Sequence, residues 1–240
     1  MKIIYAESRL PRKMQRPLDR LNGDRQLTMS AYLRLFFFGF VVRPLVYVIL
    51  GLNVRHWERL PGDGPAVIVA NHNSHLDTLV LMSLLPLRML KKLHPVADAD
   101  YFLRNRLLAW FATQIIGIIP LTRSGASPNP LSGCFQALRD GNILILFPEG
   151  SRGTPESRMA EFKRGVQIIA RKFPDVPVYP IFLHGLGKAL PKGEALLVPF
   201  FCDVFVGAPM TYRTEQENFM DALRSEMNVL AAQGEFPEWQ

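Results

Sequence analysis

The stretch IVANHNSHLDTLVLM, residues 68–82, places two histidines and an aspartate between two apolar runs. His72 and Asp77 are five residues apart, which on one continuous helix would turn their side chains about 140° away from each other. A turn at Asn73, with Ser74 as a helix N-cap, would bring them together. A carboxylate bound to an imidazole fixes its tautomer and raises the basicity of the second nitrogen. We therefore expect His72 and Asp77 to be a catalytic general-base pair.

Three other interpretations of this stretch stay open on the residues alone. Ser74 and Asp77 match an ordinary helix capping box, which would leave His72 as a surface residue. A metal site needs three or four ligands, and the sequence shows no further cluster of Cys or His, so no metal is expected. A nucleophilic Ser74 would lack the motif that surrounds such serines in hydrolases.

A second polar stretch, FPEGSRG at 147–153, directly follows the apolar run NILILF. Its Glu149 and Arg152 should lie at the same sheet edge as the histidine loop, because both follow strand-like runs. Gly150 allows the backbone a close approach, and a neighbouring arginine suits an anionic group such as phosphate. Lys163 adds a cation near a helix start, although a salt-bridged loop would have the same composition.

The segments that must position these residues alternate between strand-like and helix-like patterns. Short apolar runs typical of buried strands are AVIVAN, GIIPLT, NILILF, VPVYPIFLHG and FFCDVFVGAP. Helix-like segments lie between them, and a final helix is expected to begin with a Thr214–Glu217 capping box. The alternation predicts an α/β domain with a mixed, mostly parallel sheet flanked by helices. The face that this last helix should bury consists of Phe219, Leu223, Met227 and Leu230.

Charge and hydropathy are distributed unevenly along the 240 residues. Residues 1–55 hold ten Lys or Arg and three acids, a net +7 that equals the charge of the whole chain. The second half of this region is the almost wholly apolar segment AYLRLFFFGFVVRPLVYVILGL at 31–52, which argues against a nucleic-acid-binding arm. A basic segment that leads into an aromatic-rich apolar one indicates attachment to an anionic membrane surface. Cys134 and Cys202 have apolar neighbours and are expected to be reduced core residues.

The apolar segment is long enough to reach across a bilayer, but its composition favours another arrangement. Arg43 lies near its middle, and Pro44 should break or kink a helix there. Arg34 and Arg43 would lie about 180° apart on an α-helix, which would leave no face free of charge. We expect a kinked, monotopic helix in one leaflet at the cytoplasmic face, with a full span of the bilayer or a buried core helix as the alternatives.

Four ordered stretches together resemble the lysophospholipid acyltransferases, the family of 1-acylglycerol-3-phosphate acyltransferases. They are NHNSHLD, GIIPLTR, FPEGSRG and VPVYPIF, and the resemblance covers about residues 60–210. It implies an O-acyltransferase of phospholipid biosynthesis that moves a fatty acyl group from acyl-CoA or acyl carrier protein, with no cofactor. The acceptor would be the free hydroxyl of a lysophospholipid-like molecule such as 1-acylglycerol-3-phosphate. We expect a basic, membrane-anchoring segment at 1–58 and an acyltransferase domain at 59–240.

The resemblance also implies roles for individual residues. His72 would deprotonate the acceptor hydroxyl, Asp77 would orient the imidazole, and no acyl-enzyme would form. VPVYP would shape the acyl or acceptor pocket. The residues expected to bind substrate are Asn71, Arg123, Glu149, Gly150, Ser151, Arg152 and Lys163.

One departure from the family pattern bears on the acceptor. VADADYF places Asp98 where many close members have a lysine, and an acid disfavours a doubly charged phosphate nearby. A zwitterionic lysophospholipid or a lyso-aminolipid fits better, unless Arg104 and Arg106 replace the lost charge. Two other functions stay open: a lipid hydrolase that uses the same pair, and a non-catalytic membrane lipid-binding module.

Overall fold

The computed structural model describes most of the chain. The described residues are 29–102, 104–121, 129–150, 159–189 and 202–234. The basic segment 1–28 and three predicted site residues lie outside them, namely Arg123, Ser151 and Arg152.

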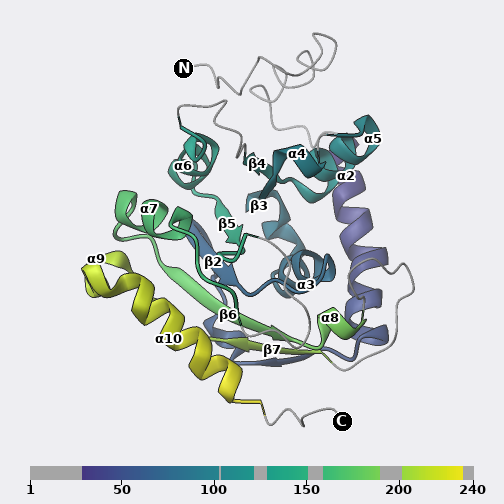
Figure 1. The fold of residues 1–240 in the computed structure, drawn as a ribbon. Helices are drawn as coiled ribbons and strands as arrows, with labels where there is room; N and C mark the ends of the chain where they lie inside the picture. The colour runs from purple at the N-terminus through teal and green to yellow at the C-terminus, as the bar shows by residue number, and fades with distance from the viewer. Residues whose placement is uncertain (1–28, 103, 122–128, 151–158, 190–201, 235–240) are drawn as a thin grey trace.

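Seven strands within the described residues form one sheet, in the order β1-β7-β6-β2-β5-β3-β4 (Figure 1). All neighbouring strands run parallel except β6 and β7, which are antiparallel. The predicted mixed, mostly parallel sheet is therefore confirmed. The strands are β1 (Asn53–Arg55), β2 (Ala66–Ala70), β3 (Leu93–Asp98), β4 (Ile119–Leu121), β5 (Ile143–Leu146), β6 (Val178–His184) and β7 (Asp203–Val206).

Helices cover both faces of the sheet. The side that carries α3 also carries a long N-terminal helix, and the opposite side carries α6, α7 and α10 (Figure 1). The α-helices are α2 (Met29–Phe36), α3 (Leu76–Leu84), α4 (Ala99–Phe102), α5 (Arg106–Trp110), α6 (Ser132–Arg139), α7 (Gly165–Lys172), α8 (Leu186–Ala189), α9 (Tyr212–Glu215) and α10 (Phe219–Ala232). Wider π-helical turns form η2 (Phe37–Val42), η3 (Leu45–Ile49) and η6 (Phe111–Ile116), and tighter 3-10 turns form η4 (Trp57–Arg59), η5 (Leu87–Lys92) and η7 (Gln216–Asn218).

The central strand β2 explains why its sequence is apolar at every position. All five of its residues are buried, and successive side chains enter opposite cores. Ile68 packs toward α3 and the N-terminal helix, whereas Val67 and Val69 pack toward α6, α7 and α10. A parallel strand covered on both faces has no solvent side that polar residues could occupy. The predicted buried strands at 66–71 and 142–147 are confirmed as β2 and β5.

The last helix buries the predicted face but begins differently. Phe219, Leu223, Met227 and Leu230 are its buried residues, as its spacing indicated. The Thr214–Glu217 capping box is wrong, because Thr211 instead caps the short helix α9 by accepting from the N–H of Thr214. Gln216 has a positive φ of 50°, a non-helical conformation that ends α9 before α10 starts.

Both cysteines are buried and free, as expected for reduced core residues. Burial raises the pKa of the Cys134 thiol and of the Cys202 thiol to about 12. Both therefore stay protonated at neutral pH and behave as small apolar side chains.

The N-terminal helix, formed by α2, η2 and η3, runs unbroken from Met29 to Ile49. Pro44 therefore does not break this helix, and the kink there stays a prediction. The N–H of Arg43 reaches back five residues to the carbonyl of Phe38, as in a π-helix. Such wide turns accommodate a proline, which lacks an N–H and crowds the carbonyl four residues before it.

The wide turns also overturn the prediction that no face of this helix is free of charge. Arg34 donates to the carbonyls of Leu93 (2.8 Å) and Ile116 (2.9 Å), and Arg43 donates to that of Leu85 (2.8 Å). On an α-helix, side chains four residues apart are offset by about 40° around the helix axis. The offset is smaller where π-helical turns hold more residues. The residues that consequently share the inner, buried face are Arg34, Phe38, Val42, Val46 and Leu50.

The outer face of the N-terminal helix is apolar and exposed. Only 22% of its most apolar window is buried, which argues against a core helix. By length and composition it is the one described helix that could cross a membrane. Its exposed apolar side chains are Met29, Tyr32, Leu33, Phe36, Phe40, Val41, Tyr47, Val48 and Ile49.

A small polar cluster fastens this helix to the sheet. Gly117, with a φ of 75°, lies so close to Arg34 that an added Cβ would come within 2.7 Å of Nη1. Nδ1 of His94 donates to the carbonyl of Gly117 at 2.9 Å. Burial lowers the pKa of His94 below its ordinary 6.5, the Gly117 hydrogen bond opposes this shift, and the charge of Arg34 adds to it.

This cluster predicts that acid destabilises the fold. Below about pH 6.5 the unfolded chain protonates His94, whereas the folded form resists this protonation. The free energy of unfolding therefore decreases as the pH is lowered. The limiting slope for one group is about 1.4 kcal/mol per pH unit. Urea unfolding between pH 7.5 and pH 5 should show this loss, and His94→Asn should flatten the curve. If stability depended on pH equally in the unchanged protein and in His94→Asn, His94 would not be the cause of the loss.

Candidate active site

The loop between β2 and α3 holds the predicted pair in contact. His72 Nδ1 lies 2.9 Å from Oδ2 of Asp77. The same oxygen accepts hydrogen bonds from the backbone N–H of Asn73 (2.7 Å) and Ser74 (2.8 Å). The Asp77 side chain is almost wholly buried, whereas 17% of the His72 side chain is exposed. The chain therefore turns at Asn73 and Ser74, as the sequence indicated.

Half of the predicted capping box coexists with the imidazole pair. Ser74 Oγ accepts a hydrogen bond from the N–H of Leu76, while Asp77 accepts from the N–H of Ser74. This is one half of a capping box, because the N–H of Asp77 donates to the backbone carbonyl of Ser74 and not to its Oγ. One carboxylate thus starts helix α3 and orients His72, so the two interpretations describe the same residue.

Two contacts fix the orientation of the His72 ring. Because the Asp77 carboxylate can only accept, Nδ1 is the donor, and in the neutral ring this leaves the lone pair on Nε2. The ring also stacks on Phe147, with centroids 4.1 Å apart and planes 22° from parallel. Phe147 opens the second polar stretch, but its apolar type gave no sign of a role in the site.

Glu149 lies at the same sheet edge, as predicted, and holds the histidine loop by its backbone. Oε1 accepts from the N–H of His72 at 3.0 Å, and Oε2 accepts from the N–H of Ala160 at 3.1 Å. Only 4% of the residue is exposed. Both carboxylate oxygens are therefore engaged in joining three segments of chain, which is a positioning role that the sequence did not reveal.

This arrangement predicts that Glu149→Gln weakens both the fold and the site. An amide has one carbonyl oxygen, so its NH₂ group would face one of the two N–H donors. Such a mismatch costs about 1–3 kcal/mol when buried. Urea unfolding should show this loss, while the nearby exposed Glu161→Gln should match the unchanged protein. Equal stability of the two variants would contradict the inferred geometry.

The other described residues predicted to bind substrate have identifiable contacts. Asn71 uses its amide to exchange hydrogen bonds with the backbone of Leu183 at 2.7 and 2.8 Å, which extends the β2–β6 pairing by one residue. Gly150 has a φ of 69°, and an added Cβ would meet the Lys163 side chain at 2.6 Å. Lys163 also donates its N–H to the carbonyl of Pro148. Gly150 and Lys163 are thus brought together beside Glu149.

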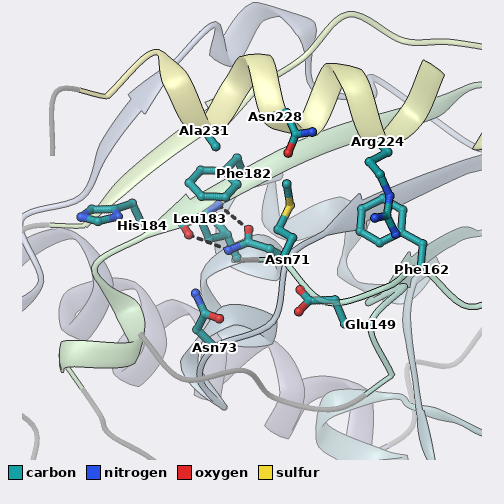
Figure 2. A pocket seen from close by; sticks show the side chains of 11 residues that line it. Asn71, Asn73, Glu149, Phe162, Phe182, Leu183, His184, Arg224, Asn228 and Ala231 are labelled. Carbon is teal, nitrogen blue, oxygen red and sulfur yellow. Dashed lines mark hydrogen bonds between the residues drawn. The ribbon is translucent and has the colours of Figure 1, made fainter. Parts of the chain in front are cut away.

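A cavity of about 510 Å³ opens beside this loop, between β6 and α10 (Figure 2). Asn71 and Asn73, on either side of His72, contribute to its wall. Figure 2 shows Arg224 and Asn228 reaching over it from α10, two residues that sequence reasoning missed. The remaining lining residues are Glu149, Met159, Phe162, Phe182, Leu183, His184 and Ala231.

The structure also shows where the VPVYP stretch and Asp98 lie. No residue of the VPVYP stretch lines this cavity, and Tyr179 packs against the core instead, whereas Phe182, two residues beyond the stretch, does line it. Asp98 ends β3, and the parallel pairing of β3 with β5 brings it to the sheet edge that carries the histidine loop. Its Oδ1 accepts from the N–H of Asp100 at 2.9 Å. In the part of the chain that the structure describes, no group of three or more His, Cys, Asp or Glu side chains could hold a metal ion.

Comparison with known proteins agrees with these motifs. A family model described as Acyltransferase matches residues 51–184. The chain is 34% identical over 152 residues to the chloroplastic 1-acyl-sn-glycerol-3-phosphate acyltransferase LPAT1 of Arabidopsis thaliana, covering 62% of this chain and 40% of that protein. It is 31% identical over 162 residues to 1-acyl-sn-glycerol-3-phosphate acyltransferase alpha of Homo sapiens, covering 66% and 54%.

The fold is also shared with a solved structure. The crystal structure of the 1-acyl-sn-glycerophosphate (LPA) acyltransferase PlsC from Thermotoga maritima superposes with a TM-score of 0.68 and 19% identity, over 87% of this chain and 82% of that one. The chain spans less than half the length of the plant relatives. Because the family model covers more than half of this chain, from the end of the N-terminal helix to the end of β6, the chain belongs to the acyltransferase family.

Proposed function

We propose that this protein transfers a fatty acyl group from an acyl thioester to the free hydroxyl of a lysophospholipid-like acceptor. The donor would be acyl-CoA or acyl carrier protein, and 1-acylglycerol-3-phosphate is one such acceptor. The observation that carries the proposal is the contact between His72 Nδ1 and the buried Asp77 carboxylate. Membership of the acyltransferase family supports the reaction class.

The geometry suggests a direct transfer with His72 as general base. Nε2 of His72 takes the proton of the acceptor hydroxyl as its oxygen attacks the thioester carbonyl carbon. The tetrahedral intermediate then collapses, the C–S bond breaks, and the leaving thiolate receives the proton from His72. Asp77 stabilises the transient imidazolium throughout, since its charge lies 2.9 Å away. No step requires an acyl-enzyme or a metal ion.

The cavity beside the loop is our candidate for the acceptor headgroup. Its walls combine the polar Asn73, Glu149 and Asn228 with apolar surfaces, and Arg224 supplies a cation. The guanidinium of Arg224 lies 4.9 Å from the centre of the Phe162 ring. Asp98 at the same sheet edge favours a zwitterionic lysophospholipid or a lyso-aminolipid over a doubly charged phosphate. Gly150 and Lys163, with Arg123, Ser151 and Arg152, would complete the binding of substrate.

Membrane association would bring this site to its lipid substrates. The N-terminal helix exposes an unbroken apolar face, because both of its arginines turn toward the body of the protein. We propose that it lies in one leaflet at the cytoplasmic face as a monotopic anchor. The basic residues of 1–28 would add attraction to anionic lipids, which high salt should weaken.

The test is thiol release from a long-chain acyl-CoA, and from acylated carrier protein, by the purified full chain. A panel of lysolipids with phosphate, zwitterionic and amino headgroups would be compared under the same conditions. We expect acceptor-dependent release with at least one headgroup class, and its loss in His72→Ala. Fatty acid release without any acceptor would indicate a hydrolase, and inactivity with both donors and every acceptor would indicate a lipid-binding module.

A further inference from the structure

A second apolar helix lies beside the N-terminal helix and is also exposed. It comprises α5 and η6, residues 106–116, and packs against α2 (Figure 1). The rings of Phe37 and Phe111 meet edge-to-face with centroids 5.4 Å apart. Leu107 is 75% exposed and Trp110 is 45% exposed, although both are large apolar residues. We call this segment the 106–116 helix.

The charges around the 106–116 helix complement an anionic lipid surface. Neither this helix nor the N-terminal helix contains an Asp or Glu. Arg104 and Arg106 are both exposed at its start, and the guanidinium of Arg104 lies 4.8 Å from the centre of the Tyr101 ring. Basic side chains and aromatic rings beside an apolar helix are typical of the boundary between lipid headgroups and acyl chains.

The segment just before this helix touches the candidate active site. Tyr101 stacks on His75, with ring centroids 5.8 Å apart and planes 25° from parallel. His75 belongs to the same loop as His72. The histidine loop is thus joined through Tyr101 and Arg104 to the exposed end of the 106–116 helix.

We propose that the 106–116 helix is a second membrane-contacting element, which enters the same anionic phospholipid leaflet as the N-terminal helix. Leu107 and Trp110 contact the acyl chains, and Arg104 and Arg106 lie at the level of the lipid phosphates. Two adjacent contacts fix the rotation of the protein on the membrane, which one helix alone does not. They hold the histidine loop next to the leaflet that contains the lipid acceptor. The inference rests on the proposed membrane association, but not on acyl transfer.

The experiment uses the full chain and vesicles with equal parts of phosphatidylcholine and phosphatidylglycerol. The sequence has three tryptophans, Trp57, Trp110 and Trp239, so replacing Trp57 and Trp239 with Phe leaves Trp110 as the reporter. We expect a blue shift of Trp110 emission on binding, and strong quenching by phospholipids brominated in their acyl chains. Emission that stays unshifted and unquenched on bound protein would overturn the proposal.

A charge placed in the contact should weaken it selectively. Leu107→Asp should reduce the vesicle partition coefficient by at least about tenfold. Ile168→Asp, at a 49% exposed apolar residue of α7 on the other side of the sheet, should leave it unchanged. Equal vesicle binding by the two variants would overturn the proposal, as would a Leu107→Asp variant that only dissociates a dimer in solution.

Thiol release with a water-soluble, short-chain acceptor separates this inference from the proposed function. Leu107→Asp should keep that activity while it loses activity on vesicle-embedded acceptor. If the unchanged protein were inactive with every acceptor while the variant that keeps only Trp110 was quenched, acyl transfer would be refuted and the membrane contact supported.

Discussion

Replacing His72 with alanine should lower the turnover number by about 10²- to 10⁴-fold, the usual contribution of a positioned general base. The imidazole is the group that the structure orients through Asp77 on one side and Phe147 on the other. The fold should survive, because Asp77 keeps its hydrogen bonds to two backbone N–H groups. The measurement is acceptor-dependent thiol release at saturating substrate, together with urea unfolding.

The neighbouring histidine offers a matched control for this experiment. His75 lies in the same loop but contacts Tyr101 instead of Asp77. His75→Ala should change turnover with a soluble acceptor by less than about threefold. If His72→Ala turned over as fast as His75→Ala, another group would have to serve as the base.

Replacing Asp77 with asparagine should impair both catalysis and stability. The new carbonyl oxygen can accept the three hydrogen bonds that now reach Oδ2, so the turn should persist. The negative charge that stabilises the imidazolium is lost, which should lower turnover by about 10²- to 10⁴-fold. A buried NH₂ group replaces Oδ1, which has no hydrogen-bond partner in the described part of the chain, and should cost about 1–3 kcal/mol.

Asp77→Ala distinguishes the two roles of this carboxylate. It removes the acceptor of the Asn73 and Ser74 N–H groups as well as the charge, so it should destabilise the fold more than Asp77→Asn does. Urea unfolding of both variants measures the difference, and thiol release measures the common loss of turnover. Full activity in Asp77→Asn would show that the aspartate acts only as a helix cap.

The local half of the site was predictable from sequence because it depends on few residues. His72 and Asp77 are five residues apart, and the turn chemistry between them leaves little choice about whether they meet. Glu149 could be placed at the same edge, because parallel strands end together. The hydrogen bonds that its carboxylate accepts from the N–H groups of His72 and Ala160 were not predictable, since backbone groups leave no signature in sequence.

The distant half of the site depends on packing that no short pattern encodes. Arg224 and Asn228 reach the cavity only because α10 lies across β6. The periodicity of α10 predicts its buried face, but not the site over which its exposed residues will project.

The sheet and the N-terminal helix show the same contrast. Continuous apolar runs identified β2 and β5, whereas β3 contains His94, Pro95 and Asp98 and did not resemble a strand. For the N-terminal helix, the assumption of 3.6 residues per turn placed its two arginines on opposite sides. The π-helical turns around Pro44 reversed that conclusion.

The most direct test of the central claim is the balance of products from one labelled acyl thioester. We predict that, with acceptor present, each thiol released is matched by one acyl ester of the acceptor, and that without acceptor neither thiol nor free fatty acid appears. Fatty acid released to water, or thiol released with the acyl group left on the protein, would contradict direct transfer by His72 to a lipid hydroxyl.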